Sequence, residues 1–307
     1  MKRILLASTL LLAACSQAEI DANAAPQDAA EAPAKPNITS QDLGGGIYVL
    51  LGPGGNIGVS TGEDGVYVID DKFARFGQEI IDVIGTLSDQ PITYVLNTHH
   101  HGDHTGANAE MKAVGATIMA HENVRKRMGI TYMNEAFGRQ QDARDASLWP
   151  TLTYSENMTL WFNGDEVRAI HVPSGHTDGD TIVHFVGANI MHLGDNFFYN
   201  MLPFVDVDSG GSIQGMIAAQ QIAYDGADAE TVIIPGHGAA TTTKAELGES
   251  IKRLQAIHDR VKARKDAGES LAAITAADPL ADMTDLESFI TKDAIIMATW
   301  RSLGGDI

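Results

Sequence analysis

The stretch NTHHHGDHTGAN, residues 97–108, decides the fold of this chain, because it places four histidines and one aspartate within six positions. The apolar stretch ITYVLNT leads into it and predicts a strand. His99 and His101 lie two residues apart, so their side chains point to the same side. Asp103 and His104 follow across a glycine, where a bend directs them toward the same space. Imidazoles and a carboxylate suit zinc, so the pattern predicts two ligands for each of two neighbouring ions.

Three further candidate ligands each follow a predicted strand, in a loop that contains glycine. They are His176 in PSGHTDGD, Asp195 in MHLGDNFF and His237 in IIPGHGAATT. An open α/β sheet presents its ligands beyond the carboxyl ends of its strands, so these three side chains fit the same site. We expect structural roles for the histidines that lack this placement, which are His121, His171, His184, His192 and His258. His100 points away from its neighbours and is expected to support a ligand or to be exposed.

Strand-like and helix-like segments alternate along the chain and predict an α/β layer architecture. Strands are expected in GIYVLLG, NIGVSTG, GVYVID and ATIMA, and later in MTLWF, EVRAIHV, TIVHF, NIMHLG and TVIIPG. Helices are expected in GQEIIDVIGTLS, GANAEMKAVG, HENVRKRM and SIQGMIAAQQIAYDG, and again in residues 243–307. Residues 129–150 show no clear periodicity, and are interpreted as a packed connector, with a mobile flap as the alternative.

The N-terminal segment is expected to be a targeting signal and a tether rather than part of the fold. Residues 1–14 combine a basic start, an apolar run and small residues, which is typical of a secretory signal peptide. The sequence LAAC that ends at Cys15 resembles the bacterial lipobox, which implies a lipid on Cys15. Residues 15–40 are rich in alanine and proline and predict a flexible tether, so the globular domain is expected to span residues 41–307.

Composition excludes some classes of partner. The 307 residues are 44% hydrophobic, which is enough for a sizeable core, and their formal net charge is -19. Loss of Lys2 and Arg3 with the signal peptide would change this to -19 - 2 = -21. Such acidity argues against a nucleic-acid partner. Cys15 is the only cysteine, so neither a disulfide nor a thiol nucleophile is expected in the folded domain.

These motifs together resemble those of the metallo-β-lactamase superfamily, over about residues 40–245. The matching segments, in order, are NTHHHGDHTGAN, GHTDGD, LGDNFF and PGHG, with NIGVSTGEDGVYVIDD resembling the usual opening strands. The resemblance implies a four-layer αββα sandwich, followed here by the helical residues 243–307. It also implies a ligand set of His99, His101 and His176 for the first ion, Asp103, His104 and His237 for the second, and Asp195 as the bridge.

The resemblance implies a hydrolase in which two divalent ions, zinc by default with iron or manganese left open, activate water. Asp103 would orient the resulting hydroxide and transfer a proton to the leaving group. The substrate would be a small molecule with an activated carbonyl or phosphoryl bond: a β-lactam, lactone, thioester or phosphodiester. Lactamases of the family usually have cysteine or serine where this chain has Asp195, which favours the other three. Tyr199 and Asn200 are candidate substrate contacts, although core or capping roles are the simpler reading.

Two other classes of function are also compatible with the sequence. One is a periplasmic lipoprotein that binds a metal or ligand without catalysis, and the other is a di-iron redox protein. A complete set of seven ligands disfavours the first, and no stretch with a dinucleotide-binding pattern supports the second. Ser16 after Cys15 resembles the residue that sorts lipoproteins to the outer membrane, so a periplasmic, membrane-anchored location is expected.

Overall fold

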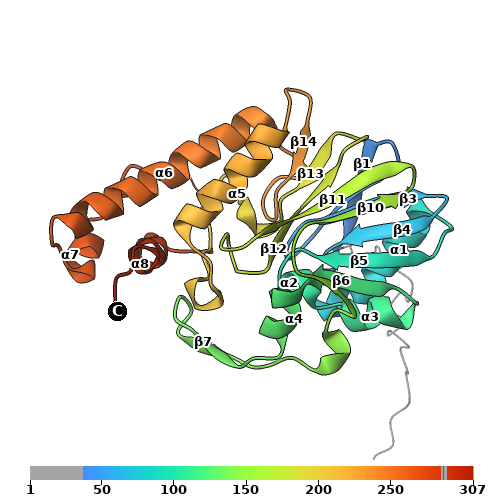
Figure 1. The fold of residues 1–307 in the computed structure, drawn as a ribbon, viewed down its shortest axis with the longest axis horizontal. Helices are drawn as coiled ribbons and strands as arrows, with labels where there is room; N and C mark the ends of the chain where they lie inside the picture. The colour runs from blue at the N-terminus through green and yellow to red at the C-terminus, as the bar shows by residue number, and fades with distance from the viewer. Residues whose placement is uncertain (1–36, 285, 287–288, 307) are drawn as a thin grey trace, which may run out of the picture. The chain divides into compact units, whose positions relative to one another are not determined.

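Two β-sheets organise the structure, a computed structural model that describes residues 37–284, 286 and 289–306. The first sheet has the strand order β1-β2-β3-β4-β5-β6-β9, with bounds Thr39–Gly44, Ile47–Leu51, Ile57–Gly62, Gly65–Ile69, Ile92–Asn97, Thr117–His121 and Leu152–Tyr154. Strands β1 to β4 are antiparallel neighbours, whereas β4, β5, β6 and β9 run parallel. The carboxyl ends of these parallel strands therefore meet at one edge, where the histidine-rich stretch follows β5 (Figure 1).

The second sheet has the order β10-β11-β12-β13-β14, with bounds Met158–Phe162, Asp165–Val172, Asp180–Phe185, Ile190–His192 and Val232–Ile234. Its first four strands are antiparallel, and β13 pairs with β14 in parallel. A small hairpin, β7 (Tyr132–Asn134) and β8 (Arg139–Gln141), lies within the segment that showed no periodicity.

The two sheets pack face to face through apolar side chains. Tyr67 and Ile69 on β4, with Leu96 on β5, belong to the same buried cluster as Val183 and Phe185 on β12. Tyr67 also makes an edge-to-face contact with Phe185, with ring centroids 6.3 Å apart. Strand β4 is buried on both faces, because its other side chains, Val66 and Val68, pack beneath the helices on the outer side. This burial on both faces explains its continuous apolar sequence GVYVI.

Helices cover the outer face of each sheet. Helix α1 (Gly77–Leu87) buries Ile80 and Ile84 in the cluster beneath the first sheet, together with Met111 of α3 (Asn108–Ala113). Helix α5 (Ile213–Gly226) packs its alanines against the second sheet, beside α6 (Lys244–Asp266) (Figure 1). The order of layers is therefore helix, sheet, sheet and helix, as predicted. The shorter helical elements are α2 (Gly102–Thr105), α4 (Glu122–Met128), η1 (Ala74–Phe76), η2 (Ala146–Leu148), η3 (Gly194–Asn196) and η4 (Val207–Ser209).

The C-terminal part is helical but not continuously so. Thr243 and Glu246 form a reciprocal capping box that starts α6, and α7 (Leu271–Ala276) and α8 (Lys292–Ser302) follow. These helices share an apolar cluster with Phe198 and Phe204, which belong to the loop after η3. The helical extension thereby supports a loop that faces the predicted ligands.

The predicted signal peptide and most of the predicted tether lie outside the described residues. The first described strand, β1, begins at Thr39, close to the predicted start of the domain. Every helix in the described ranges is too short or too polar to cross a lipid bilayer.

One buried amide connects the first sheet to the loop that contains His237. Asn56 lies just before β3, and its side-chain Nδ2 donates to the carbonyl oxygens of Pro235 (2.9 Å) and Ala239 (3.0 Å). Its backbone N–H donates to Gly236 at 2.7 Å, and the whole residue is buried. Asn56 therefore holds both sides of the turn that presents His237.

We predict that Asn56→Ala lowers the free energy of unfolding by about 2–4 kcal/mol, because it leaves two carbonyl oxygens without their donors. Urea unfolding followed by circular dichroism measures this change. Gln78→Ala, which removes an exposed amide on α1, is the matched control and should change stability by less than about 0.5 kcal/mol. Equal stability of the two variants would show that Asn56 does not hold the loop.

Candidate metal centre

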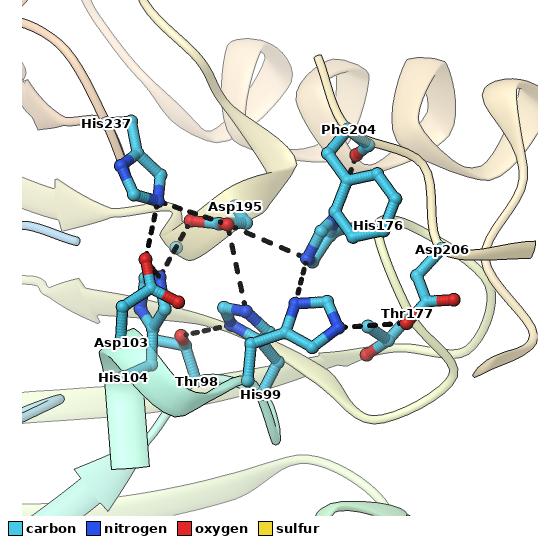
Figure 2. A network of polar contacts seen from close by, with 12 residues as sticks. Thr98, His99, Asp103, His104, His176, Thr177, Asp195, Phe204, Asp206 and His237 are labelled. Atoms are coloured by element: carbon cyan, nitrogen blue, oxygen red, sulfur yellow. Dashed lines mark hydrogen bonds and ion pairs between the residues drawn. The ribbon is translucent and has the colours of Figure 1, made fainter. Parts of the chain in front are cut away.

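Four loops at one end of the two sheets bring the seven predicted ligands together. Figure 2 labels all of these residues except His101. They follow strands β5, β11, β13 and β14. The ligand atoms of His99, His101, His176 and Asp195 all lie within 4.8 Å of one another. The same is true of Asp103, His104 and His237, which form the second group.

Asp195 lies between the two groups. Its Oδ2 is 3.7 Å from Nε2 of His99 and 3.6 Å from Nε2 of His176, both in the first group. The same oxygen is 3.4 Å from Nε2 of His237, and Oδ1 is 3.1 Å from Nε2 of His104. A single carboxylate therefore contacts both groups, as a ligand that bridges two ions must.

Neighbouring residues occupy the outer nitrogen of each of four imidazoles. Nδ1 of His99 donates to Thr98 Oγ1 (3.1 Å), because the Thr98 hydroxyl itself donates to Asp70 (2.8 Å). Nδ1 of His104 donates to Asp70 Oδ2 at 2.7 Å, and Nδ1 of His176 donates to the carbonyl oxygen of Phe204 at 2.8 Å. For His101 the outer atom is Nε2, which donates to Asp206 Oδ2 at 2.8 Å. In the neutral form of each ring these bonds place the proton on the outer nitrogen, so that the other nitrogen faces the cluster and can bind a cation.

The donor atoms that face the cluster lack hydrogen-bond partners and thus fit metal ions. Among the described residues, Nε2 of His99, Nε2 of His104 and Oδ1 of Asp195 are buried without any hydrogen bond. Nδ1 of His101 and Nε2 of His176 lie only 2.8 Å apart, although both rings carry their proton on the other nitrogen. Buried polar atoms without partners cost about 1–3 kcal/mol each, and cations between them would remove that cost.

Electrostatics within the cluster favours neutral imidazoles in one group and positive charge in the other. Burial lowers the pKa of His176 to about 4, and burial also holds the pKa of His99 well below its usual value. Burial opposes charge on His237 as well, but Asp195 and Asp103 overcome it and raise the pKa of His237 to about 9. The second group is therefore an environment that attracts a cation.

Asp103 combines contact with this cluster and access to solvent. Burial acts to raise its pKa, but the neighbouring His104 and His237 hold that pKa below the usual value, so the carboxylate is ionised. Its Oδ2 lies 3.3 Å from Nε2 of His237, and its side chain is 22% exposed. Asp103 thus differs from Asp195, which is buried, and it can meet a bound substrate.

A cavity of about 570 Å³ opens over the cluster. His101, Asp103, Asp195 and His237 form its floor, and four phenylalanines form much of its wall: Phe73, Phe137, Phe204 and Phe289. The hairpin of β7 and β8 supplies several other wall residues, among them Tyr132 and Arg139. The segment interpreted as a packed connector therefore forms part of the cavity wall.

Tyr199 and Asn200 lie away from this cavity. The Tyr199 hydroxyl donates to Glu246 on α6 at 2.7 Å, and both residues border a separate hollow beside that helix. The backbone N–H of Tyr199 donates to the His237 carbonyl oxygen at 3.0 Å, which directs the preceding side chain, Phe198, onto the imidazole instead. Asn200 adopts a left-handed backbone conformation with φ of 53°. The positions of Tyr199 and Asn200 agree with a structural role beside α6 and do not support contact with a substrate in the cavity.

The remaining histidines lie outside the two ligand groups. His121 stacks on His171 with ring centroids 3.5 Å apart, and His192 donates from Nε2 to the Asn56 carbonyl oxygen. His184 lies within β12 and His258 on α6. His100 is buried next to the cluster, where its Nε2 lies 3.4 Å from the hydroxyls of both Tyr132 and Ser209.

Sequence reasoning missed two carboxylates that hold ligands. Asp70 follows β4 and Asp206 lies in the loop before η4. Asp70 was detectable in principle, since the sequence VID places a carboxylate at the end of a buried strand. Asp206 carries no such signal, because it reaches His101 across 105 positions of the chain.

Comparison with known proteins agrees with this geometry. The family model of the metallo-β-lactamase superfamily matches residues 85–237, which include all seven candidate ligands. The chain belongs to the metallo-β-lactamase superfamily. The predicted family and fold class are thereby confirmed.

The chain spans about half the length of the first curated relatives that it matches. Hydroxyacylglutathione hydrolase from Pelagibacter ubique is 30% identical over 140 residues, which cover 43% of this chain and 50% of the relative. The α subunit of 2,4-dinitroanisole O-demethylase from Nocardioides sp. is 24% identical over 55% of this chain and 50% of the relative.

Solved structures are similar to this chain in fold. A metallo-β-lactamase from Pontibacter korlensis covers 71% of this chain and 99% of its own length, with a TM-score of 0.60 and 15% identity. A sec-alkylsulfatase from Pseudomonas sp. covers 87% of this chain and 50% of its own length, with a TM-score of 0.64 and 15% identity. At such low identity these two likenesses describe the fold alone.

We predict that the purified domain binds close to two equivalents of divalent metal, and that His101→Ala lowers this number toward one. His101 has no ligand atom in the group of Asp103, His104 and His237, so its loss should spare that group. Elemental analysis after dialysis measures the stoichiometry. His258→Ala, which removes an imidazole from α6, is the control and should retain the full content. Unchanged metal content in His101→Ala would contradict the assignment.

Proposed function

We propose that this protein is a metal-dependent hydrolase with two ions, zinc by default, held by His99, His101, His176, Asp103, His104, His237 and the bridging Asp195. The observation that carries the proposal is the position of Asp195, whose two oxygens face the imidazoles of both groups. When bound, two such ions would lower the pKa of a water and polarise the substrate oxygen under attack.

The protein's own side chains would contribute positioning and proton transfer. Asp103, partly exposed at the cavity floor, would orient the attacking water and transfer its proton to the leaving group. The aromatic wall excludes bulk water from the apolar part of the substrate. For a thioester, water adds its oxygen to the carbonyl carbon, the carbon–sulfur bond breaks, and the thiol leaves with a proton.

The substrate class we favour is an activated acyl compound, a thioester or lactone, ahead of a phosphodiester or β-lactam. A carboxylate at position 195 supports this order, since lactamases of the family usually carry cysteine or serine there. The similarity to hydroxyacylglutathione hydrolases, which are named for a thioester substrate, points the same way. A non-catalytic binding protein and a di-iron redox protein remain the alternatives.

The test is a substrate panel with nitrocefin, a carbapenem, an acyl lactone, a glutathione thioester and bis-p-nitrophenyl phosphate. We expect the lactone or thioester to give the highest kcat/KM, and Asp103→Asn to lower its kcat by about 10²- to 10⁴-fold. Asp82→Asn, an exposed change on α1, is the matched control and should retain activity. Efficient turnover of β-lactams alone would contradict the substrate order. Turnover that survives complete chelation would contradict the metal-dependent mechanism.

We also propose that a lipid on Cys15 anchors the protein to a membrane on the periplasmic side. The outer membrane is the proposed site, because Ser16 after Cys15 resembles the residue that sorts lipoproteins there. The support is the sequence alone, namely the apolar run that ends in LAAC and the alanine- and proline-rich residues after it. Cys15→Ser in the full chain should shift the protein from the membrane fraction to the soluble fraction. An unchanged distribution between the fractions, read by immunoblot, would contradict a lipid on Cys15.

A further inference from the structure

Three arginines line the cavity above the metal centre, and they differ in how their charge is balanced. Arg127 is fully engaged: its guanidinium forms a two-point pair with Asp178, at 3.1 Å and 2.6 Å, and also donates to the Asp208 carbonyl oxygen. Arg139 on β8 is exposed to solvent, with its guanidinium 5.3 Å from the Phe137 ring centroid. The charge of Arg127 is therefore paired, and that of Arg139 is solvated.

Arg144 is placed differently, beside the ligand loop itself. Its guanidinium packs against Gly102, so closely that a β-carbon at that glycine would lie 3.3 Å from Nη2 of Arg144. One N–H, on Nη1, donates to the Thr105 hydroxyl. Among the described residues, no carboxylate lies within ion-pair distance of this guanidinium. Within the described residues Thr105 is the only hydrogen-bond partner of this guanidinium, which has five donors and lines the cavity together with Asp103.

Two hydrogen bonds hold the backbone of Arg144 and thereby fix the position from which its side chain extends. Its N–H donates to the Met128 carbonyl oxygen at 2.7 Å, and its carbonyl oxygen accepts from Trp149 Nε1 at 3.1 Å. Burial lowers the pKa of Arg144, with Tyr132, Asp103 and Asp71 only partly offsetting it, yet the guanidinium stays charged because arginine is so strong a base. A partly buried charge without a partner costs stability unless a ligand supplies the opposite charge.

Apolar side chains surround the mouth of the same cavity. Ile130 is 48% exposed, Phe137 38% and Phe289 53%, and all three line the cavity with the buried Phe204. Exposed apolar groups gathered at a cavity mouth favour a ligand with an apolar portion. The cavity thus offers two chemically distinct surfaces, a guanidinium near the floor and a hydrocarbon rim.

We propose that Arg144 forms an anion-binding subsite, which selects substrates carrying a carboxylate or sulfate near the bond to be cleaved and an apolar group beyond it. The role of Arg144 in substrate selection rests on the proposed hydrolase function. Anion binding by Arg144 can be measured without turnover. A guanidinium is suited to it, because its forked donors match the two oxygens of such a group.

The competing role for Arg144 is purely structural. Through Thr105, whose hydroxyl also donates to the His101 carbonyl oxygen at 2.9 Å, Arg144 could simply brace the loop that presents the ligands. A brace would affect neutral and anionic ligands equally and would reduce metal content when removed. An anion subsite would affect only anionic ligands and would leave the metal content unchanged.

The experiment measures ligand binding to the metal-loaded protein by calorimetry, with 4-phenylbutyrate and phenyl sulfate as anionic probes and 4-phenylbutyramide as the neutral match. We expect Arg144→Gln to weaken binding of at least one anionic probe by about tenfold to hundredfold, as for loss of a charge-assisted hydrogen bond. Binding of the amide and the metal content should not change. Arg168→Gln, which removes an exposed arginine paired with Glu166 on the second sheet, should bind all three probes as the wild type does.

A second variant and a kinetic comparison complete the test. Arg144→Lys keeps the positive charge but lacks the forked N–H donors of a guanidinium. It should therefore restore part of the affinity for the anionic probes, and it serves as a second folded variant for comparison. Where turnover exists, p-nitrophenyl hemisuccinate should lose more kcat/KM than p-nitrophenyl butyrate in Arg144→Gln. Equal effects on anionic and neutral probes, or no effect on either anionic probe, would overturn the subsite. Absence of turnover in the wild type contradicts the hydrolase proposal alone, since the calorimetry still decides the role of Arg144.

Discussion

The structure depends most on one constraint, the placement of the Asp195 carboxylate between two groups of buried imidazoles. Two parallel neighbours, β13 and β14, bring the loops of Asp195 and His237 together. The approach is so close that a β-carbon at Gly236 would lie 2.2 Å from Asp195 Oδ1, so only glycine fits at this position. The backbone N–H of Gly236 also donates to the Gly194 carbonyl oxygen at 2.9 Å, which fixes the spacing of the two loops.

The rest of the site follows from the need to keep proton donors away from the centre of the cluster. Three of the four rings that are held on their outer side use a partner from another element: Asp70 after β4, the Phe204 carbonyl oxygen after η3, and Asp206 before η4. The fourth ring, His99, uses its neighbour Thr98, which Asp70 holds in turn. Lone pairs that face one another in a buried space repel, so this arrangement is costly without cations. The fold therefore accepts local strain at the site, which the two packed sheets and their helices stabilise.

The candidate ligands could be recognised in the sequence because they cluster in glycine-containing loops that follow apolar strands, a signal confined to a few consecutive residues. The layer order was predictable for a similar reason, since buried strands such as GVYVI contrast clearly with amphipathic helices. Contacts between distant segments carry no such signal. Asp206 and Arg144 could not be recognised, because neither has a local pattern and each acts on the loop of residues 99–105 from far along the chain. Tyr199 was misleading, because pairing of its backbone with His237 turns its side chain toward α6.

The segment without periodicity, residues 129–150, is connected to the metal centre through hydrogen bonds rather than through regular structure. Tyr132 on β7 donates to Asp206 Oδ2 at 3.1 Å, and the same oxygen accepts from His101. The hairpin therefore reaches a candidate ligand through a single carboxylate, while its other residues form the cavity wall. A change in the hairpin that moved the Tyr132 hydroxyl would therefore also alter the hydrogen bonding of Asp206, which orients His101. Residues 129–150, which show the least sequence pattern, thus shape the cavity and help to hold the His101 imidazole in place. Both roles follow from side-chain contacts that the sequence does not indicate.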